Sequence, residues 1–200
     1  MTACLVIASR NEKKKQELLQ IIGDLDLKVA TLNEFPGAPE VEEDGLTFRD
    51  NAIKKAREVA RFTGCLTLAD DSGLEVDALG GSPGVYSARF AGEPTDDERN
   101  NRKLMEMLRG VPAQERTARF RCVIAIAFPD DRVETTEGIC EGRISITPGG
   151  QGGFGYDPLF VPDGFSQTFA ELGPEVKNRI SHRGKALQEV SKLLQELSIV

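Results

Sequence analysis

Two adjacent carboxylates directly after a short apolar run constrain this chain more than any other feature. Residues 66–73 read LTLADDSG. The alternating apolar positions predict a buried strand that ends at Asp70 and Asp71, with a tight turn after it. In open α/β sheets, ligands bind beyond the carboxyl ends of strands. Neighbouring strand residues face opposite sides of the sheet. We therefore expect one aspartate to lie close to the reacting groups and the other to support it structurally.

A second interpretation of the same stretch needs no chemistry. Aspartate is common at strand-end turns, where its side chain bonds the local backbone. For this stretch alone, a capped structural turn is the favoured explanation. The remaining motifs must therefore decide between the two interpretations.

The bulk composition limits the class of protein. The chain has 200 residues, a net charge of −7 and 40% hydrophobic residues. This length, with no shift in composition, predicts a single domain over residues 1–200. The acidic balance argues against a general nucleic-acid binder, which carries a basic face. The longest apolar run is only residues 122–128, and no basic segment precedes the first apolar run, so we expect no membrane span and no secretory signal.

The four cysteines, at positions 4, 65, 122 and 140, are widely spaced and form no C-x-x-C pair. We interpret them as buried thiols of a cytoplasmic protein, because the cytosol keeps thiols reduced.

The periodicity of the chain predicts an α/β fold on a mixed sheet. The expected strands are residues 3–9, 27–32, 66–71, 74–76, 116–128, 133–146 and 159–161. The expected helices are residues 12–22, 47–63, 96–108 and 181–197. The first two strands and their helix make a β-α-β opening, and the strands at 116–128 and 133–146 make a hairpin. Thr95 is the expected N-cap of the third helix.

The first strand-to-helix turn is a candidate phosphate site. Ser9 and Asn11 supply donors where a helix start attracts anions, and Lys14 lies one turn further on. The pattern is not a Walker A loop. An exposed basic helix start, with Lys13 and Lys14 in solvent, explains the same residues equally well.

An acidic loop at residues 40–44 is a candidate partner of the two aspartates. Its carboxylates, with Asp70 and Asp71, would form an oxygen site that suits Mg²⁺ or Mn²⁺. Alone, the loop reads as a solvated charged segment. A histidine-rich zinc site is excluded, because His182 is the only histidine.

Two later motifs are candidates for binding a nucleobase. In the glycine-rich segment 152–158, Phe154 can stack on a flat ring and Asp157 can bond its edge; a structural turn is the alternative. Ser181, His182 and Arg183 begin the last helix, where the latter two can donate to a base carbonyl. The alternative is a serine N-cap followed by two surface residues.

Five separated motifs occur in order along the chain: SRNEKK at 9–14, ADDSG at 69–73, GGSPG at 80–84, FGYD at 154–157 and SHR at 181–183. Together they resemble the inosine triphosphate pyrophosphatase, or XTP/dITP diphosphatase, family over residues 5–194. The resemblance implies an α/β fold, with an elongated mixed β-sheet, helices in two lobes and a central active-site cleft. It also implies a homodimer and Mg²⁺-dependent hydrolysis of ITP, dITP and XTP to the monophosphate and pyrophosphate.

The resemblance also implies roles for individual residues. Asp71 is similar to the family's general base, and Glu43 and Asp71 to its metal ligands. The residues that resemble triphosphate contacts are Ser9, Arg10, Asn11, Glu12, Lys13 and Lys14. The residues that resemble other nucleotide contacts are Ser72, Phe154, Gly155, Tyr156, Asp157, Lys177, His182 and Arg183. The sequence departs from the family at Arg10, where a small residue is common, and at Asp50, which replaces a glutamate.

Two other functions remain open at this point. One is a related pyrophosphatase for modified pyrimidine nucleotides, against which the purine-edge donors His182 and Arg183 argue. The other is a nucleotide sensor that does not hydrolyse its ligand. A sensor needs no working base or metal ligands, whereas Glu43, Asp70 and Asp71 are all present.

Overall fold

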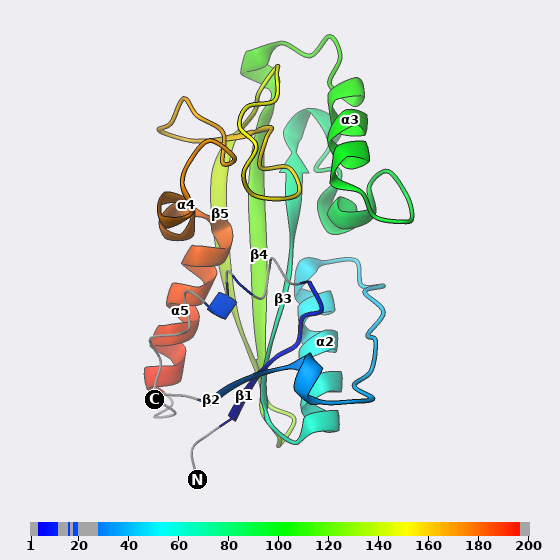
Figure 1. Cartoon of the computed structure of the whole chain (residues 1–200), viewed down its shortest axis with the longest axis vertical. Helices are drawn as coiled ribbons and strands as arrows, with labels where there is room; N and C mark the ends of the chain where they lie inside the picture. The colour runs from blue at the N-terminus through cyan, green and yellow to red at the C-terminus, as the bar shows by residue number, and fades with distance from the viewer. Residues whose placement is uncertain (1–3, 12–15, 17, 20–27, 197–200) are drawn as a thin grey trace. The chain divides into compact units, whose positions relative to one another are not determined.

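The architecture comes from a computed structural model, which describes all residues except 1–3, 12–15, 17, 20–27 and 197–200 (Figure 1). The strands are β1 Cys4–Ile7, β2 Lys28–Thr31, β3 Leu66–Val76, β4 Thr117–Ala127, β5 Val133–Ile144 and β6 Phe160–Pro162. The α-helices are α2 Phe48–Thr63, α3 Asp97–Met107, α4 Pro174–Ile180 and α5 His182–Glu196. Short 3₁₀ helices span Leu32–Glu34, Asp77–Leu79, Gly84–Arg89 and Ala113–Glu115.

The described strands form one mixed sheet, in the order β2-β1-β3-β4-β5-β6. β1 is parallel to β2 and to β3, and β5 is antiparallel to β6. The amide of Phe128 donates to the carbonyl of Arg132, and the amide of Ile144 to that of Arg116, so β4 and β5 are joined at both ends as a hairpin. The predictions of a mixed α/β fold and of this hairpin are confirmed. The predicted helix at 12–22 lies largely outside the described residues.

The chain divides into two compact units built from separate stretches. The first unit contains Met1–Asp71, Cys122–Gly138 and Arg183–Val200, and the second contains Ser72–Arg121 and Ile139–His182. Whether they act as one domain, as the sequence predicts, stays a prediction.

In the first unit, helices cover both faces of the strands. Leu5, Leu68 and Ile124 pack with Leu187 and Val190 of α5 in one apolar cluster. The alternate strand positions are buried as well, and α2 lies on the opposite side of the strands from α5 (Figure 1). Burial on both faces explains the nearly continuous apolar run of β4.

Helix α2 has well-formed ends. The Thr47 hydroxyl accepts from the amide of Asp50, and Gly64 ends the helix in a left-handed conformation at φ 67°. Asp50 also accepts a 2.7 Å hydrogen bond from Thr47 Oγ1. The aspartate that departs from the family pattern therefore takes part in capping α2.

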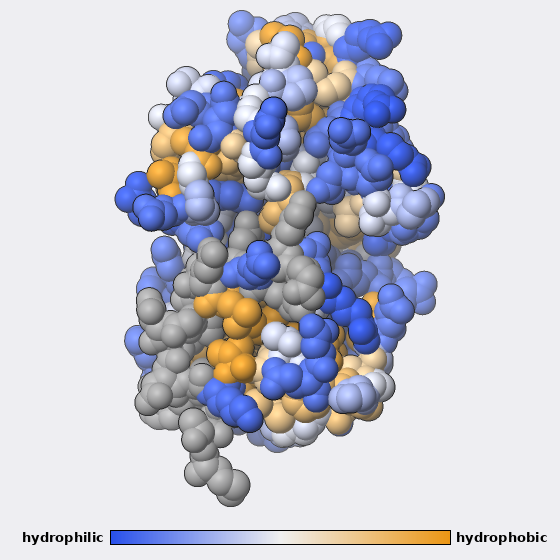
Figure 2. Space-filling model, in the orientation of Figure 1, coloured by the Kyte–Doolittle hydropathy of each residue, from blue (hydrophilic) through white to orange (hydrophobic). Residues whose placement is uncertain are grey.

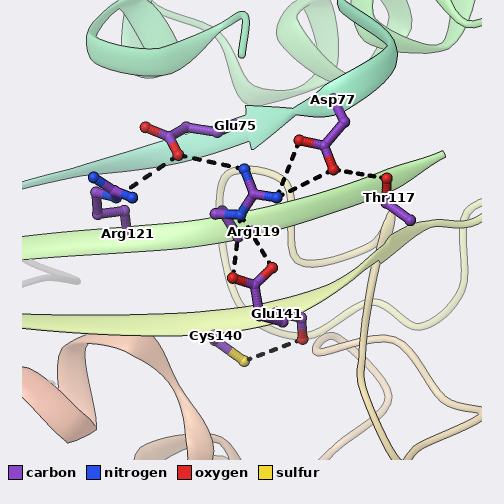
Figure 3. A network of polar contacts seen from close by, with 7 residues as sticks. All are labelled: Glu75, Asp77, Thr117, Arg119, Arg121, Cys140 and Glu141. Atoms are coloured by element: carbon purple, nitrogen blue, oxygen red, sulfur yellow. Dashed lines mark hydrogen bonds and ion pairs between the residues drawn. The ribbon is translucent and has the colours of Figure 1, made fainter. Parts of the chain in front are cut away.

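In the second unit, the two faces of the sheet differ sharply. Phe120 packs with Phe160 at a ring-centroid distance of 4.7 Å, inside an aromatic core. The next strand position, Arg119, faces the other way and pairs with Asp77 and Glu141 at 3.0 Å each (Figure 3). Period-two alternation along β4 thus separates an apolar core from a layer of ion pairs.

Strand β3 corrects the sequence prediction. It does not end at the two aspartates in a tight turn, but runs unbroken from Leu66 to Val76. Beyond the aspartates, Leu74 and Val76 are fully buried. Their burial in the core of the second unit keeps this part of the chain extended, where the local sequence favoured a turn.

Other boundaries shift for local reasons. Helix α3 begins at Asp97, because Asp96 and not Thr95 is the N-cap, with its carboxylate accepting from the amide of Arg99 at 2.8 Å. Helix α4 was not predicted. Ser181, in an extended conformation at ψ 158°, separates it from α5.

No disulfide joins the four cysteines, all of which are described; Cys122 and Cys140 are buried, whereas Cys4 and Cys65 are only half-buried. Within the described parts of the chain, no helix combines the length and apolarity needed to cross a membrane.

Candidate active site

The two aspartates of β3 point to opposite faces of the strand and have different partners. Asp70 lies on the side of Leu68, toward α5, where Arg183 Nη2 is 3.4 Å from its Oδ2. Asp71 lies on the other side, where Asn51 Nδ2 of α2 donates to its Oδ2 at 3.0 Å. Both carboxylates are buried, at 1% and 5% exposure. The two adjacent aspartates are therefore bound to different side chains, with Asp70 beside a buried arginine, and the division of labour between them stays a prediction.

Asn51 connects Asp71 to the acidic loop. The asparagine is 1% exposed, and its Oδ1 accepts from the amide of Gly45 at 2.7 Å. A Cβ on Gly45 would lie 2.6 Å from this oxygen, so only glycine fits here without movement. The loop is thus held against the first turn of α2, next to Asp71.

Lys55, one turn after Asn51, is the cation of this group. Its ammonium bonds Glu43 Oε1. Burial disfavours the charged form, but the attraction of Asp70, Glu43 and Asp71 outweighs burial and raises the pKa of Lys55. One lysine therefore interacts with three carboxylates that lie on two separate segments of sequence.

The first turn after β1 is also organised by hydrogen bonds. Ser9 Oγ accepts from the amide of Asn11 at 3.2 Å, and Arg10 Nη2 donates to the carbonyl of Ala38 at 2.9 Å. Arg10 is thereby tied to the segment that leads into the acidic loop. Three predicted phosphate contacts, Glu12, Lys13 and Lys14, lie outside the described residues.

In the second unit, the loop 152–158 folds around one carboxylate. Asp157 Oδ2 accepts from the amide of Phe154 at 2.8 Å and from Lys177 Nζ at 2.7 Å. The same ammonium lies 4.6 Å from the centre of the Phe154 ring. A Cβ on Gly153 would come within 2.1 Å of the carboxylate. Three predicted contacts, Phe154, Asp157 and Lys177, are therefore brought together, and Asp157 also has the structural role of closing the turn.

Two further predicted contacts of the second unit differ in burial. Tyr156 belongs to the core, where its hydroxyl donates to the carbonyl of Ser87 at 2.8 Å. Burial, helped by the charge of Asp97, raises the pKa of this phenol. Ser72, the first residue of the unit, is half-buried.

His182 and Arg183 are not surface residues, as the alternative interpretation held. His182 is buried and stacks on Phe120, with ring centroids 4.7 Å apart and an interplanar angle of 11°. Arg183 is 2% exposed beside Asp70. These neighbours in sequence belong to different units, His182 to the second and Arg183 to the first.

Comparison with known proteins decides the family. The model of the Ham1 family matches residues 5–193. The chain belongs to the Ham1 family. The dITP/XTP pyrophosphatase of Desulforamulus reducens is 60% identical over 195 residues, 98% of this chain and 97% of that protein. The dITP/XTP pyrophosphatase of Geobacter sulfurreducens is 53% identical over 183 residues, covering 92% of each chain.

A solved structure supports the same assignment. A HAM1 protein from Coxiella burnetii superposes with a TM-score of 0.89 at 43% sequence identity, over 97% of this chain and 99% of that one. The resemblance inferred from the five motifs is thereby confirmed, and so is the α/β fold with a mixed β-sheet and flanking helices that it implied.

This member of the Ham1 family has two further candidate site residues that the sequence analysis did not predict. Asn51 and Lys55 lie four residues apart on α2, so they share one face of the helix, and this face meets Asp71 and Glu43. The sequence signal that could have identified these two residues is their i, i+4 spacing on a predicted helix that follows the acidic loop.

Proposed function

We propose that this chain hydrolyses ITP, dITP and XTP to the monophosphate and pyrophosphate, and so removes these nucleotides from the cellular pool. Close relatives over nearly the whole chain are dITP/XTP pyrophosphatases. The observation that carries the proposal is the interacting group of Asp71, Asn51, Lys55 and Glu43, in which Asp71 and Asn51 are buried and Lys55 and Glu43 are partly exposed. A protein that only bound nucleotides would have no need to hold two carboxylates and a lysine in this way.

In this proposal, Asp71 is the general base and orients the attacking water. Asn51 donates a hydrogen bond to Oδ2 of Asp71. This hydrogen bond fixes the orientation of the carboxylate that acts as the base. Lys55 offsets the negative charge that accumulates when a triphosphate approaches Glu43 and Asp71.

Mg²⁺, with Mn²⁺ as a second choice, is the metal that this donor set fits. Glu43 and Asp71 would bind a metal ion only through carboxylate oxygens, which are the ligands that hard cations prefer. Among the described residues, no three His, Cys, Asp or Glu side chains form a complete metal cage. Mg²⁺ commonly binds through one or two carboxylates plus substrate phosphates, so two protein ligands suffice. When bound, the ion neutralises charge on the phosphoryl oxygens.

The triphosphate is assigned to the turn after β1. Ser9, Arg10 and Asn11 are held by local hydrogen bonds, which supports a preformed set of donors. The sequence adds Glu12, Lys13 and Lys14 to this segment.

The base is assigned to Phe154, Lys177, His182 and Arg183, with Ser72, Gly155, Tyr156 and Asp157 as supporting contacts. Phe154 would stack on the ring. His182 and Arg183 would donate to the carbonyl at position 6 of hypoxanthine or xanthine. Adenine has an amine there, and a donor facing a donor costs ~1–3 kcal/mol, or roughly 5- to 150-fold for each contact. Because Tyr156 lies in the core, its contribution would come from its backbone.

The proposal extends to the oligomeric state and the cellular location of the protein. We expect a homodimer, as the family resemblance implies. We also expect a cytoplasmic location, which four cysteines without a disulfide support.

The test is release of pyrophosphate from ITP, dITP, XTP, GTP, ATP and modified pyrimidine triphosphates, with Mg²⁺, with Mn²⁺ and with a chelator. We expect release from the first three with Mg²⁺, little from ATP, and none with the chelator. Preference for pyrimidines would support the related pyrophosphatase. Tight ITP binding without any pyrophosphate would support the sensor.

A further inference from the structure

Both backbone hydrogen-bonding groups of Gly155, its N–H and its C=O, are bound by side chains of one helix. Asp97 Oδ2 accepts from the amide of Gly155 at 2.8 Å, and Asn101 Nδ2 donates to the carbonyl of Gly155 at 2.9 Å. Asp97 and Asn101 are four residues apart on α3, so both side chains project from one face of the helix. The N–H donor of Gly155 thus has a carboxylate as its acceptor, and the C=O acceptor of Gly155 has an amide as its donor.

The loop itself makes no use of these two groups of Gly155. Its turn is closed by the Phe154 amide on Asp157 Oδ2 and by the Asp157 amide on the Phe154 carbonyl, at 3.2 Å. Gly155 has φ +60°, and no atom lies within 4 Å of the position that a Cβ would occupy. Because no atom packs against this side of Gly155, the hydrogen bonds to its N–H and C=O restrain the residue here.

Open space beside the loop makes the two hydrogen bonds more important. A cavity of ≈ 560 Å³ adjoins this side of α3, and Asn101, Met105, Pro148 and Pro158 line part of it. The outer surface of α3 is largely hydrophilic (Figure 2). With space on this side, the hydrogen bonds to Asp97 and Asn101 restrain the backbone at Gly155 from the side of α3.

Asn101 has one fixed orientation. Its Oδ1 is buried and has no hydrogen-bond partner in the described part of the chain. Turning the amide over would place this oxygen against the Gly155 carbonyl, oxygen to oxygen. The hydrogen bond from Nδ2 to the Gly155 carbonyl therefore fixes which way the Asn101 amide points.

We infer that Asp97 and Asn101 are positioning residues for base selection, which act by fixing the loop that carries Phe154 and Asp157. This inference rests on the proposed function, in which that loop contacts the purine. Rotation of the backbone about Gly155 would move the neighbouring Phe154 ring and the Asp157 carboxylate together. Loss of either hydrogen bond should therefore weaken base recognition and leave the chemistry at Asp71 unaffected.

The chain offers a matched control at the neighbouring position. Asn100 is also buried on α3, but it bonds Ala88 and Ala91 of another segment. Asn101→Asp and Asn100→Asp make the same chemical change one residue apart. For the exposed Asp97, Asp97→Ala removes the acceptor and Asp97→Asn retains one. Glu98→Ala controls for the loss of a negative charge in the first turn of α3.

The experiment measures KM and kcat for ITP and ATP, together with hydrogen exchange of the peptide that contains Gly155. For Asn101→Asp and Asp97→Ala, we expect faster exchange, a roughly 2- to 10-fold higher KM for ITP and a lower ITP-to-ATP preference, with kcat nearly unchanged. Asp97→Asn should restore most of the wild-type behaviour. Asn100→Asp and Glu98→Ala should leave the preference unchanged.

Three results would overturn the inference. Unchanged exchange at Gly155 would show that the two side chains do not hold the loop. Faster exchange with unchanged KM and preference would show that holding the loop is irrelevant to base selection. An equal loss of kcat on both nucleotides would indicate a general structural role. If the wild-type protein releases no pyrophosphate, the proposed function fails, and the Kd values for ITP and ATP replace KM in the same comparison.

Discussion

Asn51 Nδ2 donates a 3.0 Å hydrogen bond to Asp71 Oδ2, while Oδ1 of the same amide accepts from Gly45. One buried side chain thus orients the proposed general base and anchors the loop that carries Glu43. On the other face of β3, Asp70 instead meets Arg183. The two adjacent aspartates can therefore be separated experimentally.

Asp71→Asn should lower kcat for ITP by ~10²–10⁴, the usual worth of general-base catalysis, with little change in Tm. The isosteric control is Asp70→Asn, which leaves Arg183 buried beside a neutral group and should lower Tm more than Asp71→Asn does. A variant Asp71→Asn that keeps more than a tenth of wild-type kcat would show that the base is another residue.

Lys55→Met should lower kcat/KM for ITP by at least ~10², because the carboxylates around it lose their cation. Since Asp71 raises the pKa of Lys55, the Lys55 ammonium in turn favours the ionised form of Asp71. The Lys55→Met variant lacks this ammonium, so the acidic limb of its pH–rate profile should lie at higher pH than that of the wild type. Lys54→Met is the control, because Lys54 pairs with Asp44 on the exposed side of the helix. Similar activity losses in both variants would contradict a special role for Lys55.

Arg183→Ala should reduce the ITP-to-ATP preference, with a large loss on ITP and a smaller one on ATP. Because Arg183 is buried beside Asp70, the variant should also be less stable, by about 3–5 kcal/mol. Lost stability affects both substrates equally, so the ratio of their kcat/KM values is the informative measurement. Arg183→Lys retains the charge and gives a second, better-folded variant. An unchanged ratio in both would assign Arg183 to a role other than reading the base.

Asp77→Asn should destabilise the protein at neutral pH but not in acid. Thr117 donates to Asp77 and, together with the charge of Arg119, lowers the carboxyl pKa below its ordinary 3.8, against the effect of burial (Figure 3). A depressed pKa gives stability that is present above the ordinary value and is lost as pH falls through the folded value.

Asp77 is partly exposed, so its contribution is about 1 kcal/mol or less and the Tm difference at pH 7 at most about 2–4 °C. Thermal unfolding of the wild type, Asp77→Asn and Thr117→Val at pH 7 and near pH 3 tests this. A Tm difference that persists undiminished in acid would refute the linkage.

Much of the fold is local in origin, and this part could be predicted. Helix α2 follows from apolar residues at helical spacing between Thr47 and Gly64, which cap it. The β4–β5 hairpin follows from two alternating runs around a turn. Short helices and strands cannot be predicted from periodicity in this way. Helix α4, with seven residues, has too few turns to show a period, and its position depends on Lys177 reaching Asp157.

The sequence by itself determined that two adjacent carboxylates on a strand must face opposite ways, because side chains alternate along extended backbone. It also determined the family, because five motifs in order are specific. Only the tertiary structure decided that Asp70 meets Arg183 and Asp71 meets Asn51, since alternation does not say which helix covers which face. The role of Lys55 likewise depends on residues 12 to 16 positions away in sequence. Such partners are chosen by packing, which no local pattern encodes.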